Sequence, residues 1–336
     1  MKFQDKINKT KLLYLTVLMA VMTLIFSCSK VIEIDVPSSE SMLVVEGTIK
    51  LGQKPIVLLS ETQGYFDPIN LNFWENYLSG AQVNVSVENE TFELIETYPS
   101  ELDYEQLTYL SELFKIPQYI LPYIPLPVYT ISRRIPESKQ LRGAEGKTYD
   151  LHVVYEDYET FASTTMHPGI ELEYSYFLFP ENSLSDSLGV INIVYSDPDS
   201  LGNAYRVATR RINKYPEWHE LSGEVKDPFF IYPLGSVWDD LIVNGQTYDF
   251  PLLRYPTAND SLDSDEIGLW KIGDTVLVKF ETIDLNAYET LLSYEMALSA
   301  QGNPFSPPTN VISHLDSALG WWIATSDYVD TVICQP

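Results

Sequence analysis

The stretch whose residue types come closest to catalytic chemistry is a glycine-containing segment that looks like a phosphate-binding loop. It reads Gly143-Ala144-Glu145-Gly146-Lys147-Thr148. A phosphate loop needs an earlier glycine at the position that Leu141 occupies, and it needs a helix N-terminus whose N–H groups face the phosphate. The residues after Thr148 instead alternate between polar and apolar types, as in a strand. We therefore interpret the segment as a turn that leads into a strand.

Histidines and grouped carboxylates are the other side chains that could bind a metal or transfer protons. The four histidines form no H-E-x-x-H pair, and no G-x-S-x-G nucleophile elbow occurs. Two acidic stretches, Asp197-Pro198-Asp199 and residues 260–266, lack the spacing and central glycine of a calcium loop. We expect solvated acidic turns there, with weak calcium binding as the alternative. The sequence predicts no catalytic residue, no metal site and no cofactor.

One cysteine, Cys28, has a sequence context that predicts covalent modification. Lysines precede an apolar run from Leu12 to Phe26, and the small residue Ser27 comes directly before Cys28. The run is shorter than the roughly 20 apolar residues of a bilayer span, and its parts follow the order of an export signal. Leu24-Ile25-Phe26-Ser27-Cys28 resembles a lipobox, where lipoprotein signal peptidase cuts before a cysteine that carries diacylglycerol. The alternative is an ordinary signal peptide, or an anchor helix, with an incidental cysteine.

Lipid on Cys28 predicts attachment to a membrane without any spanning segment. Each buried methylene contributes about 0.8 kcal/mol, and two acyl chains hold a protein stably. The formal net charge of −26, from 47 acidic and 21 basic residues, repels polyanions and excludes nucleic acid as a partner. The second cysteine, Cys334, is left as an unpaired thiol because the chain has only two cysteines.

Short runs of β-branched residues with turn signals between them set the predicted fold class. They predict a mainly all-β chain with an immunoglobulin- or transthyretin-like sandwich and a second β-rich domain that contains one helix. Asp284 or Asn286 caps this helix, and Gly302 follows it as a stop signal. The predicted organisation is a signal peptide at 1–27, a tether at 28–41, the sandwich at 42–170 with an insertion at about 98–140, and the β-rich domain at 171–336.

The insertion at about 98–140 departs from the strand pattern. Leucines and Phe114 have helical spacing between Leu102 and Phe114, and a proline-rich but apolar stretch follows. Loops are normally polar, so this composition suits either a surface that docks a partner or a segment that covers an open end of its own sandwich. The candidate docking residues are Tyr119, Ile120, Leu121, Tyr123, Ile124, Leu126 and Tyr129.

Several landmarks along the chain resemble one family, the domain of unknown function 4249 family. Those landmarks are Cys28 to Asp35, Leu43 to Gly47, Gly80 to Val85, Gly146 to Leu151, Gly302 to Asn310 and Leu319 to Trp322. Ser313-His314 stands where that family usually has an asparagine. The resemblance implies a Bacteroidota-type outer-membrane lipoprotein, typically encoded beside a TonB-dependent transporter, and it assigns no catalytic residue.

The resemblance also sets the functional hypotheses. The first is a non-enzymatic accessory of a TonB-dependent transporter in nutrient capture or uptake, anchored in outer-membrane lipid through Cys28. We expect it on the cell-surface face rather than the periplasmic face, because Glu33 and Asp35 follow the cysteine. The alternatives are a structural or assembly lipoprotein of the cell surface and, more weakly, a hydrolase with a site that the sequence does not reveal.

Overall fold

The computed structural model describes a defined part of the chain. The described residues are Tyr14 and residues 41–64, 72–180, 185–213, 227–255, 268–300 and 310–335. Cys28, residues 260–266 and the motif at 302–309 lie outside them. The chain divides into a unit of residues 1–40 and a compact unit of residues 41–336, and the described strands all belong to the second unit. Within the described residues, no helix is long and apolar enough to cross a membrane.

The prediction of a mainly β fold is confirmed. Among the described residues, those before 170 form seven strands: β1 (Leu43–Lys50), β2 (Ile56–Glu61), β3 (Gln82–Val87), β4 (Glu90–Thr97), β5 (Val128–Thr130), β6 (Thr148–Tyr155) and β7 (Tyr158–Thr165). Later residues form eight: β8 (Tyr174–Leu178), β9 (Leu188–Ser196), β10 (Ala204–Arg211), β11 (Val237–Asp239), β12 (Thr247–Leu252), β13 (Trp270–Lys271), β14 (Thr275–Ile283) and β15 (Leu319–Ile333). The helices are α2 (Tyr104–Phe114), α3 (Leu285–Ala300) and the 3₁₀ turns η1 (Phe73–Asn76), η2 (Pro99–Glu101), η3 (Leu121–Tyr123) and η4 (Glu137–Lys139).

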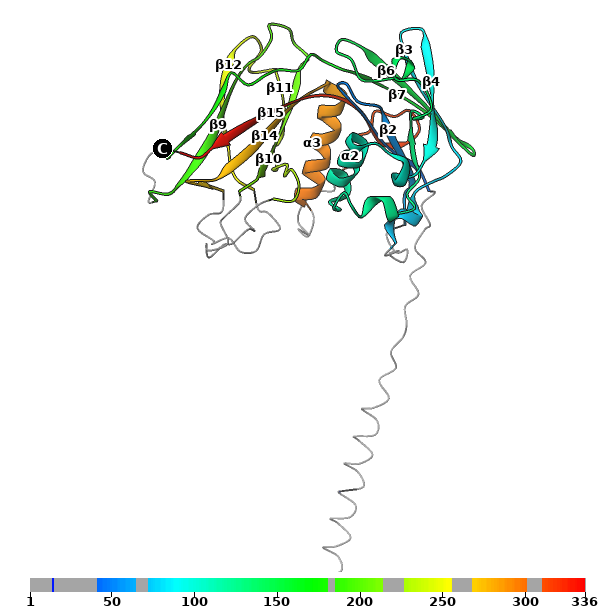
Figure 1. The fold of residues 1–336 in the computed structure, drawn as a ribbon, viewed down its shortest axis with the longest axis horizontal. Coiled ribbons are helices and arrows are strands. Elements are labelled where there is room, and N and C mark those ends of the chain that lie inside the picture. The colour runs from blue at the N-terminus through cyan, green and yellow to red at the C-terminus, as the bar shows by residue number, and fades with distance from the viewer. Residues whose placement is uncertain are drawn as a thin grey trace, which may run out of the picture. The chain divides into compact units, whose positions relative to one another are not determined.

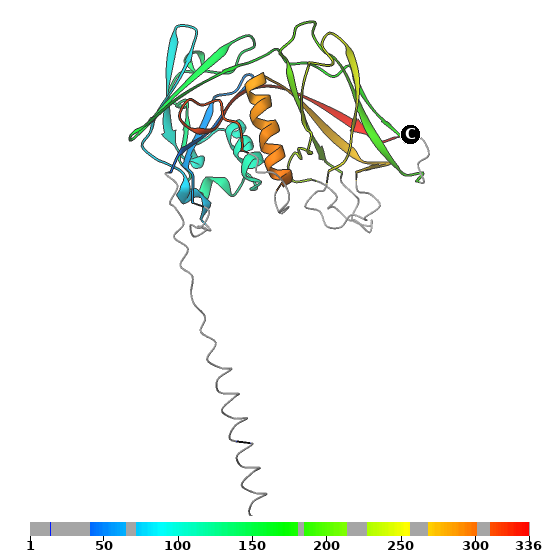
Figure 2. The same ribbon diagram turned by 180° about the vertical axis from the view of Figure 1, so that it is seen from behind.

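The long strand β15 connects the two groups of strands. One sheet has the order β11-β10-β14-β15-β1-β2-β5-β4-β3-β6-β7. The first part of β15 pairs in parallel with β1, and the rest pairs antiparallel with β14. Both views show it running from one group to the other (Figures 1 and 2). A second sheet contains β12, β9 and β13, with β8 also on β9. The domain boundary that we predicted at residue 170 stays a prediction, and this continuous sheet crosses it.

Two apolar cores lie on the same side of β15, one in each group of strands. Because side chains alternate along a strand, one face of β15 supplies Trp322 to the first core and Val332 to the second. The Trp322 indole N–H donates to the Tyr149 carbonyl over 2.9 Å, which connects β15 to β6. The second core is rich in rings, and Tyr205 stacks on Phe280 with centroids 5.3 Å apart.

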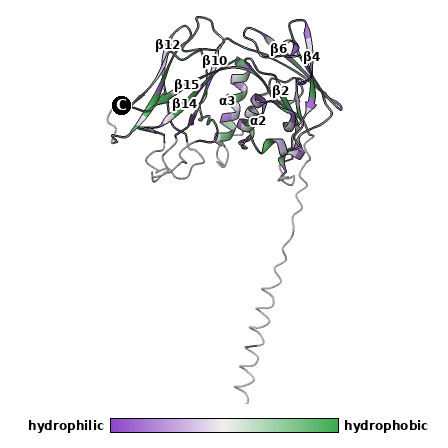
Figure 3. Ribbon diagram, in the orientation of Figure 1, coloured by the Kyte–Doolittle hydropathy of each residue, from purple (hydrophilic) through white to green (hydrophobic). Residues whose placement is uncertain are grey.

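Helix α3 packs against β10, β11 and β15 on the other side of the long sheet. Figure 3 shows hydrophilic and hydrophobic residues mixed along it, as expected for a helix with one covered face. Its N-cap is Asp284, whose Oδ1 accepts from the Ala287 N–H over 2.8 Å. The predicted helix is confirmed, and Asp284 rather than Asn286 caps it.

The segment between β4 and β5 folds back over β2 and β5. Asp103 and Gln106 form a capping box at the start of α2, and Lys115 ends the helix in the left-handed conformation. Leu110 of α2 and Leu121 of η3 join Leu58 of β2 in a third apolar cluster. The helical spacing that we read in this segment is confirmed by α2.

Candidate functional site

The seven candidate docking residues divide into two groups by exposure. Four of them are buried in the protein's own core: Leu121, Ile124, Leu126 and Tyr129. The other three point to solvent, with Tyr119 76% exposed, Tyr123 86% exposed and Ile120 less so. A buried side chain cannot contact a partner in this conformation. The docking hypothesis therefore narrows to Tyr119, Ile120 and Tyr123. Leu121, Ile124 and Leu126 cover the sheet, and Tyr129 lies in strand β5 of the sheet itself.

Tyr129 of strand β5 is buried in the first core. Its hydroxyl donates to the Leu78 carbonyl and accepts from the Ala81 N–H, both over 3.0 Å. Burial raises the pKa of Tyr129 to about 12, so the hydroxyl stays protonated and remains a donor. These bonds fix the chain before β3 against β5 and leave the hydroxyl no role toward a ligand.

The exposed aromatic residues stand on an ordered backbone. The Ile120 N–H donates to the Pro117 carbonyl over 2.9 Å, and the Tyr123 N–H donates to the Ile120 carbonyl over 3.0 Å. The Gln118 amide donates to the Tyr104 carbonyl over 3.2 Å, which brings exposed Tyr104 beside this turn. We call Tyr104, Tyr119, Ile120 and Tyr123 the tyrosine surface. Because its backbone is already ordered, this surface would lose little conformational entropy on binding a partner.

A charged cluster lies on the helix-covered side of the long sheet. The Lys50 Nζ is 2.8 Å from Asp327 Oδ2 and 3.9 Å from Glu281 Oε1. The Lys279 Nζ is 3.0 Å from the same Glu281 oxygen. The Tyr232 hydroxyl donates a hydrogen bond to this oxygen over 3.1 Å. Cations and carboxylates thus alternate across β1, β15 and β14, so each charge is matched by its neighbours.

The charges in this cluster shift one another's pKa values. Burial alone would lower the pKa of Lys50, but the Asp327 and Glu281 carboxylates outweigh it, and the pKa is raised. Burial would raise the pKa of Asp327, but Lys50 and Lys279 outweigh it, and the pKa is lowered. Both groups stay charged at neutral pH. The cluster therefore acts as an ionic connection between strands far apart in the sequence.

Helix α2 completes this connection. Its Glu112 accepts from the Phe230 N–H over 2.9 Å, and Lys115 donates to the Phe230 carbonyl over 2.9 Å. The Tyr109 and Thr48 hydroxyls are 2.9 Å apart and join α2 to β1. The segment that covers the sheet is thereby attached to residues from the C-terminal half.

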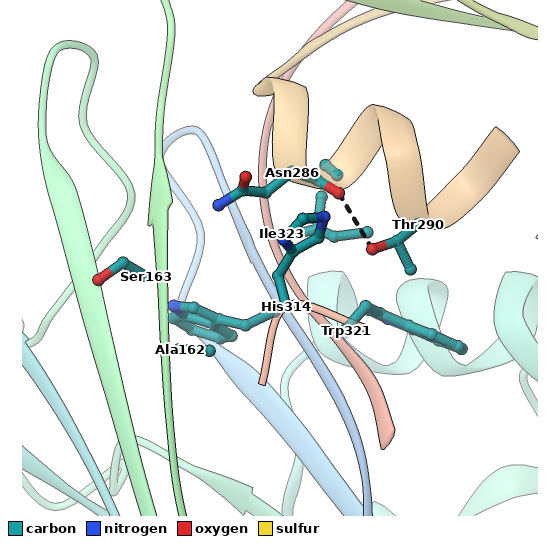
Figure 4. Close-up of a pocket in the computed structure, with 9 residues that line it drawn as sticks. Ala162, Ser163, Asn286, Thr290, His314, Trp321 and Ile323 are labelled. Carbon is teal, nitrogen blue, oxygen red and sulfur yellow. Dashed lines mark hydrogen bonds between the residues drawn. The ribbon is translucent and has the colours of Figure 1, made fainter. Parts of the chain in front are cut away.

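A small recess lies between α3 and β15 (Figure 4). Asn286 and Thr290 come from α3, and Trp321 and Ile323 come from β15. The remaining lining residues are Ala162, Ser163, Ala287, His314 and Trp322. The Thr290 hydroxyl donates a hydrogen bond to the Asn286 carbonyl over 3.0 Å. The cavity volume is about 10 Å³, which is room for about one water molecule, so this recess is too small for a nutrient.

The glycine-containing segment at 143–148 is a turn before β6. The Gly146 N–H donates to the Met166 carbonyl over 2.8 Å, and the Ala144 N–H donates to the Tyr149 hydroxyl over 2.7 Å. Backbone N–H groups that a phosphate loop would offer to its ligand are thus used inside the protein.

His152 and His167 contact neighbouring residues of the protein. His152 stacks on Phe161 with centroids 4.4 Å apart, and its Nε2 is 2.9 Å from the Glu159 carboxylate. The His167 carbonyl accepts from the Ser326 hydroxyl over 2.7 Å. Within the part of the chain that the structure describes, no group of three or more His, Cys, Asp or Glu side chains is arranged to hold a metal ion.

One acidic stretch differs from the expectation of a solvated turn. Asp199 is exposed, but Asp197 is buried and accepts from the Tyr205 hydroxyl and, over 3.0 Å, from the Gly245 N–H. The prediction of solvation was wrong for Asp197, because its partners lie in other segments and give no signal near it in the sequence.

The fold and these contacts define a mainly β protein in which one long strand, a charged cluster and a covering helical segment hold two groups of strands together. A family model described as "Domain of unknown function (DUF4249)" matches residues 29–328. The chain belongs to this family. A comparison with curated proteins finds no match.

Proposed function

We propose that the protein is an outer-membrane lipoprotein, anchored by acyl chains on Cys28, and a non-enzymatic accessory of a TonB-dependent transporter in nutrient capture or uptake. The signal-like first 27 residues and the lipobox-like sequence before Cys28 support the anchor. The family resemblance supports the outer-membrane location and the transporter. Anchored through Cys28, the protein would lie on the cell-surface face of the outer membrane.

The tyrosine surface is the observation that carries the accessory role. Tyrosine is enriched at protein interfaces, because its ring supplies contact area and loses little rotational freedom. Tyr119 and Tyr123 extend from a turn whose prolines and hydrogen bonds already order it. We therefore assign transporter docking to this surface rather than to the buried residues of the same segment.

The test replaces only the exposed rings. Tyr119→Ser with Tyr123→Ser is made in the full-length chain, and the transporter is measured in material purified from solubilised outer membrane. We expect co-purification to fall at least fivefold while the melting temperature stays within about 2 °C. The control is Tyr174→Ser, at an exposed tyrosine on β8. Equal recovery of the transporter with the double variant and the control would contradict the proposal.

A further inference from the structure

Two loops come together at one edge of the C-terminal group of strands. The first connects β9 to β10 (residues 197–203), and the second connects β11 to β12 (residues 240–246). Ala204 pairs with Asp239, so both loops leave the paired strands at the same end, at the upper edge of Figure 1. The Asp240 N–H donates to the Asn203 carbonyl over 3.0 Å. We call these two loops the double loop.

Buried carboxylates fix the double loop through reciprocal hydrogen bonds. Asp240, in the second loop, accepts from the Gly202 and Asn203 N–H groups of the first loop, each over 2.9 Å. Asp197, in the first loop, accepts from the Gly245 N–H of the second loop over 3.0 Å. Both carboxylates are buried, and bonds to buried charged groups are among the strongest that a loop can make. The two loops therefore hold each other in one conformation.

This rigid support exposes three large aliphatic side chains. Leu201 is 69% exposed, Leu241 is 73% exposed and Ile242 is 84% exposed, whereas Val243 beside them is buried. Single exposed apolar residues are common on protein surfaces, but three on two loops that bind each other form one apolar tip. Because the backbone is fixed beforehand, burial of these side chains in a partner costs little conformational entropy.

The acidic surroundings of the apolar tip favour a partner with basic residues. Residues 196–203 and 237–249 contain no lysine or arginine, and Asp199 is exposed in the first loop, beside Gly245 of the second. An anionic membrane surface repels such a tip. A second copy of this chain, with its net charge of −26, repels it as well. A partner with basic residues around an apolar pocket attracts it.

We infer that the double loop is a second protein-docking surface, which inserts Leu201, Leu241 and Ile242 into an apolar pocket with a basic rim on another protein. This surface shares no residue with the tyrosine surface and does not depend on it. Its charge makes the association sensitive to salt, because basic and acidic groups at the edge of an interface attract each other less at high ionic strength.

The test places a photo-crosslinking amino acid, benzoylphenylalanine, at position 242 of the full-length chain in intact cells. The matched control carries it at position 95, where exposed Ile95 lies on β4. Position 242 should give one crosslinked protein, and peptide mapping should place the link in an apolar stretch flanked by lysine or arginine. A link to lipid, a link to a second copy, no link, or the same product from position 95 would overturn the inference.

Two further measurements define the chemistry. In isolated membranes, raising NaCl from 50 to 500 mM should lower the yield of the crosslink at least threefold. Leu201→Ser with Leu241→Ser should lower it at least fivefold without a change in melting temperature, since both side chains are exposed. A yield that resists both changes would show that neither the basic rim nor the aliphatic tip takes part.

Discussion

Lys50 in β1 and Asp327 in β15 form an ion pair with 2.8 Å between Nζ and Oδ2, although 277 positions separate them in the sequence. The pair lies beside the point at which β15 changes its partner from β1 to β14. It therefore connects the two groups of strands at the strand that they share, and Glu281 and Lys279 extend the connection into β14.

This pair predicts how stability changes with pH. The pKa of Asp327 is lowered, so its contribution is fully present above the ordinary value of 3.8 and is lost as the pH falls toward the lowered value. The pKa of Lys50 is raised, so its contribution is present below the ordinary value of 10.5 and is lost as the pH rises above that value. Urea unfolding of Lys50→Met and the unaltered protein should therefore differ most between about pH 5 and 10. A constant difference from pH 3 to 11 would contradict the ionic connection.

Removal of the cap of α3 should destabilise the protein. Asp284 binds the start of α3 and also accepts from the Thr164 hydroxyl over 2.7 Å and the Thr165 N–H over 2.9 Å. We expect Asp284→Ala to lower the free energy of unfolding by about 2–4 kcal/mol. Asn286→Ala, at the exposed alternative position, should change it by no more than about 0.5 kcal/mol. Equal losses in denaturant unfolding would mean that Asp284 is not the cap.

The covering segment should contribute to stability through its buried residues alone. Leu121 of η3 is fully buried against β2, so Leu121→Ala should lower the free energy of unfolding by about 2–5 kcal/mol. Tyr123→Ala, two residues later, should change it by less than about 0.5 kcal/mol because the ring is exposed. Thermal or urea unfolding of the two variants measures the contrast, and similar values for both would show that the segment does not pack on β2 and β5.

Cys334 should be unreactive in the folded protein. It is buried, and this burial raises the pKa of its thiol to about 12, which leaves almost no thiolate at neutral pH. We expect no reaction with a thiol reagent such as Ellman's reagent until the protein, made from residue 42 onward, is denatured. One thiol per chain should then react. Rapid reaction before denaturation would show that the C-terminal end opens.

The lipid anchor can be tested at one residue. Cys28→Ala removes the thiol that receives diacylglycerol, so we expect an uncleaved precursor or a protein that is released from the membrane fraction. Mass spectrometry of the N-terminal peptide and fractionation of membranes measure the two results. A Cys28→Ala protein that is still cleaved before residue 28 and still carries lipid would refute the anchor.

The sequence by itself determined the features that depend on local pattern. Alternation of side chains predicted strands such as β3, and helical spacing predicted α2, because a backbone with a period of two or 3.6 residues imposes that pattern on its own residues. The same reasoning located the cap of α3 only to Asp284 or Asn286, since both are good capping residues.

Only the tertiary structure decided the features that depend on distant partners. Asp284 is the cap because Thr164 and Thr165 hold its second oxygen in place. Leu121 is buried and Tyr123 is exposed within one turn, because β2 and β5 lie on one side of η3. Leu201, Leu241 and Ile242 resemble core residues in the sequence, and their exposure appears only when Asp197 and Asp240 bring two loops together. Contacts between residues far apart in the chain leave no periodic signal near either one, so the sequence pattern could not reveal them.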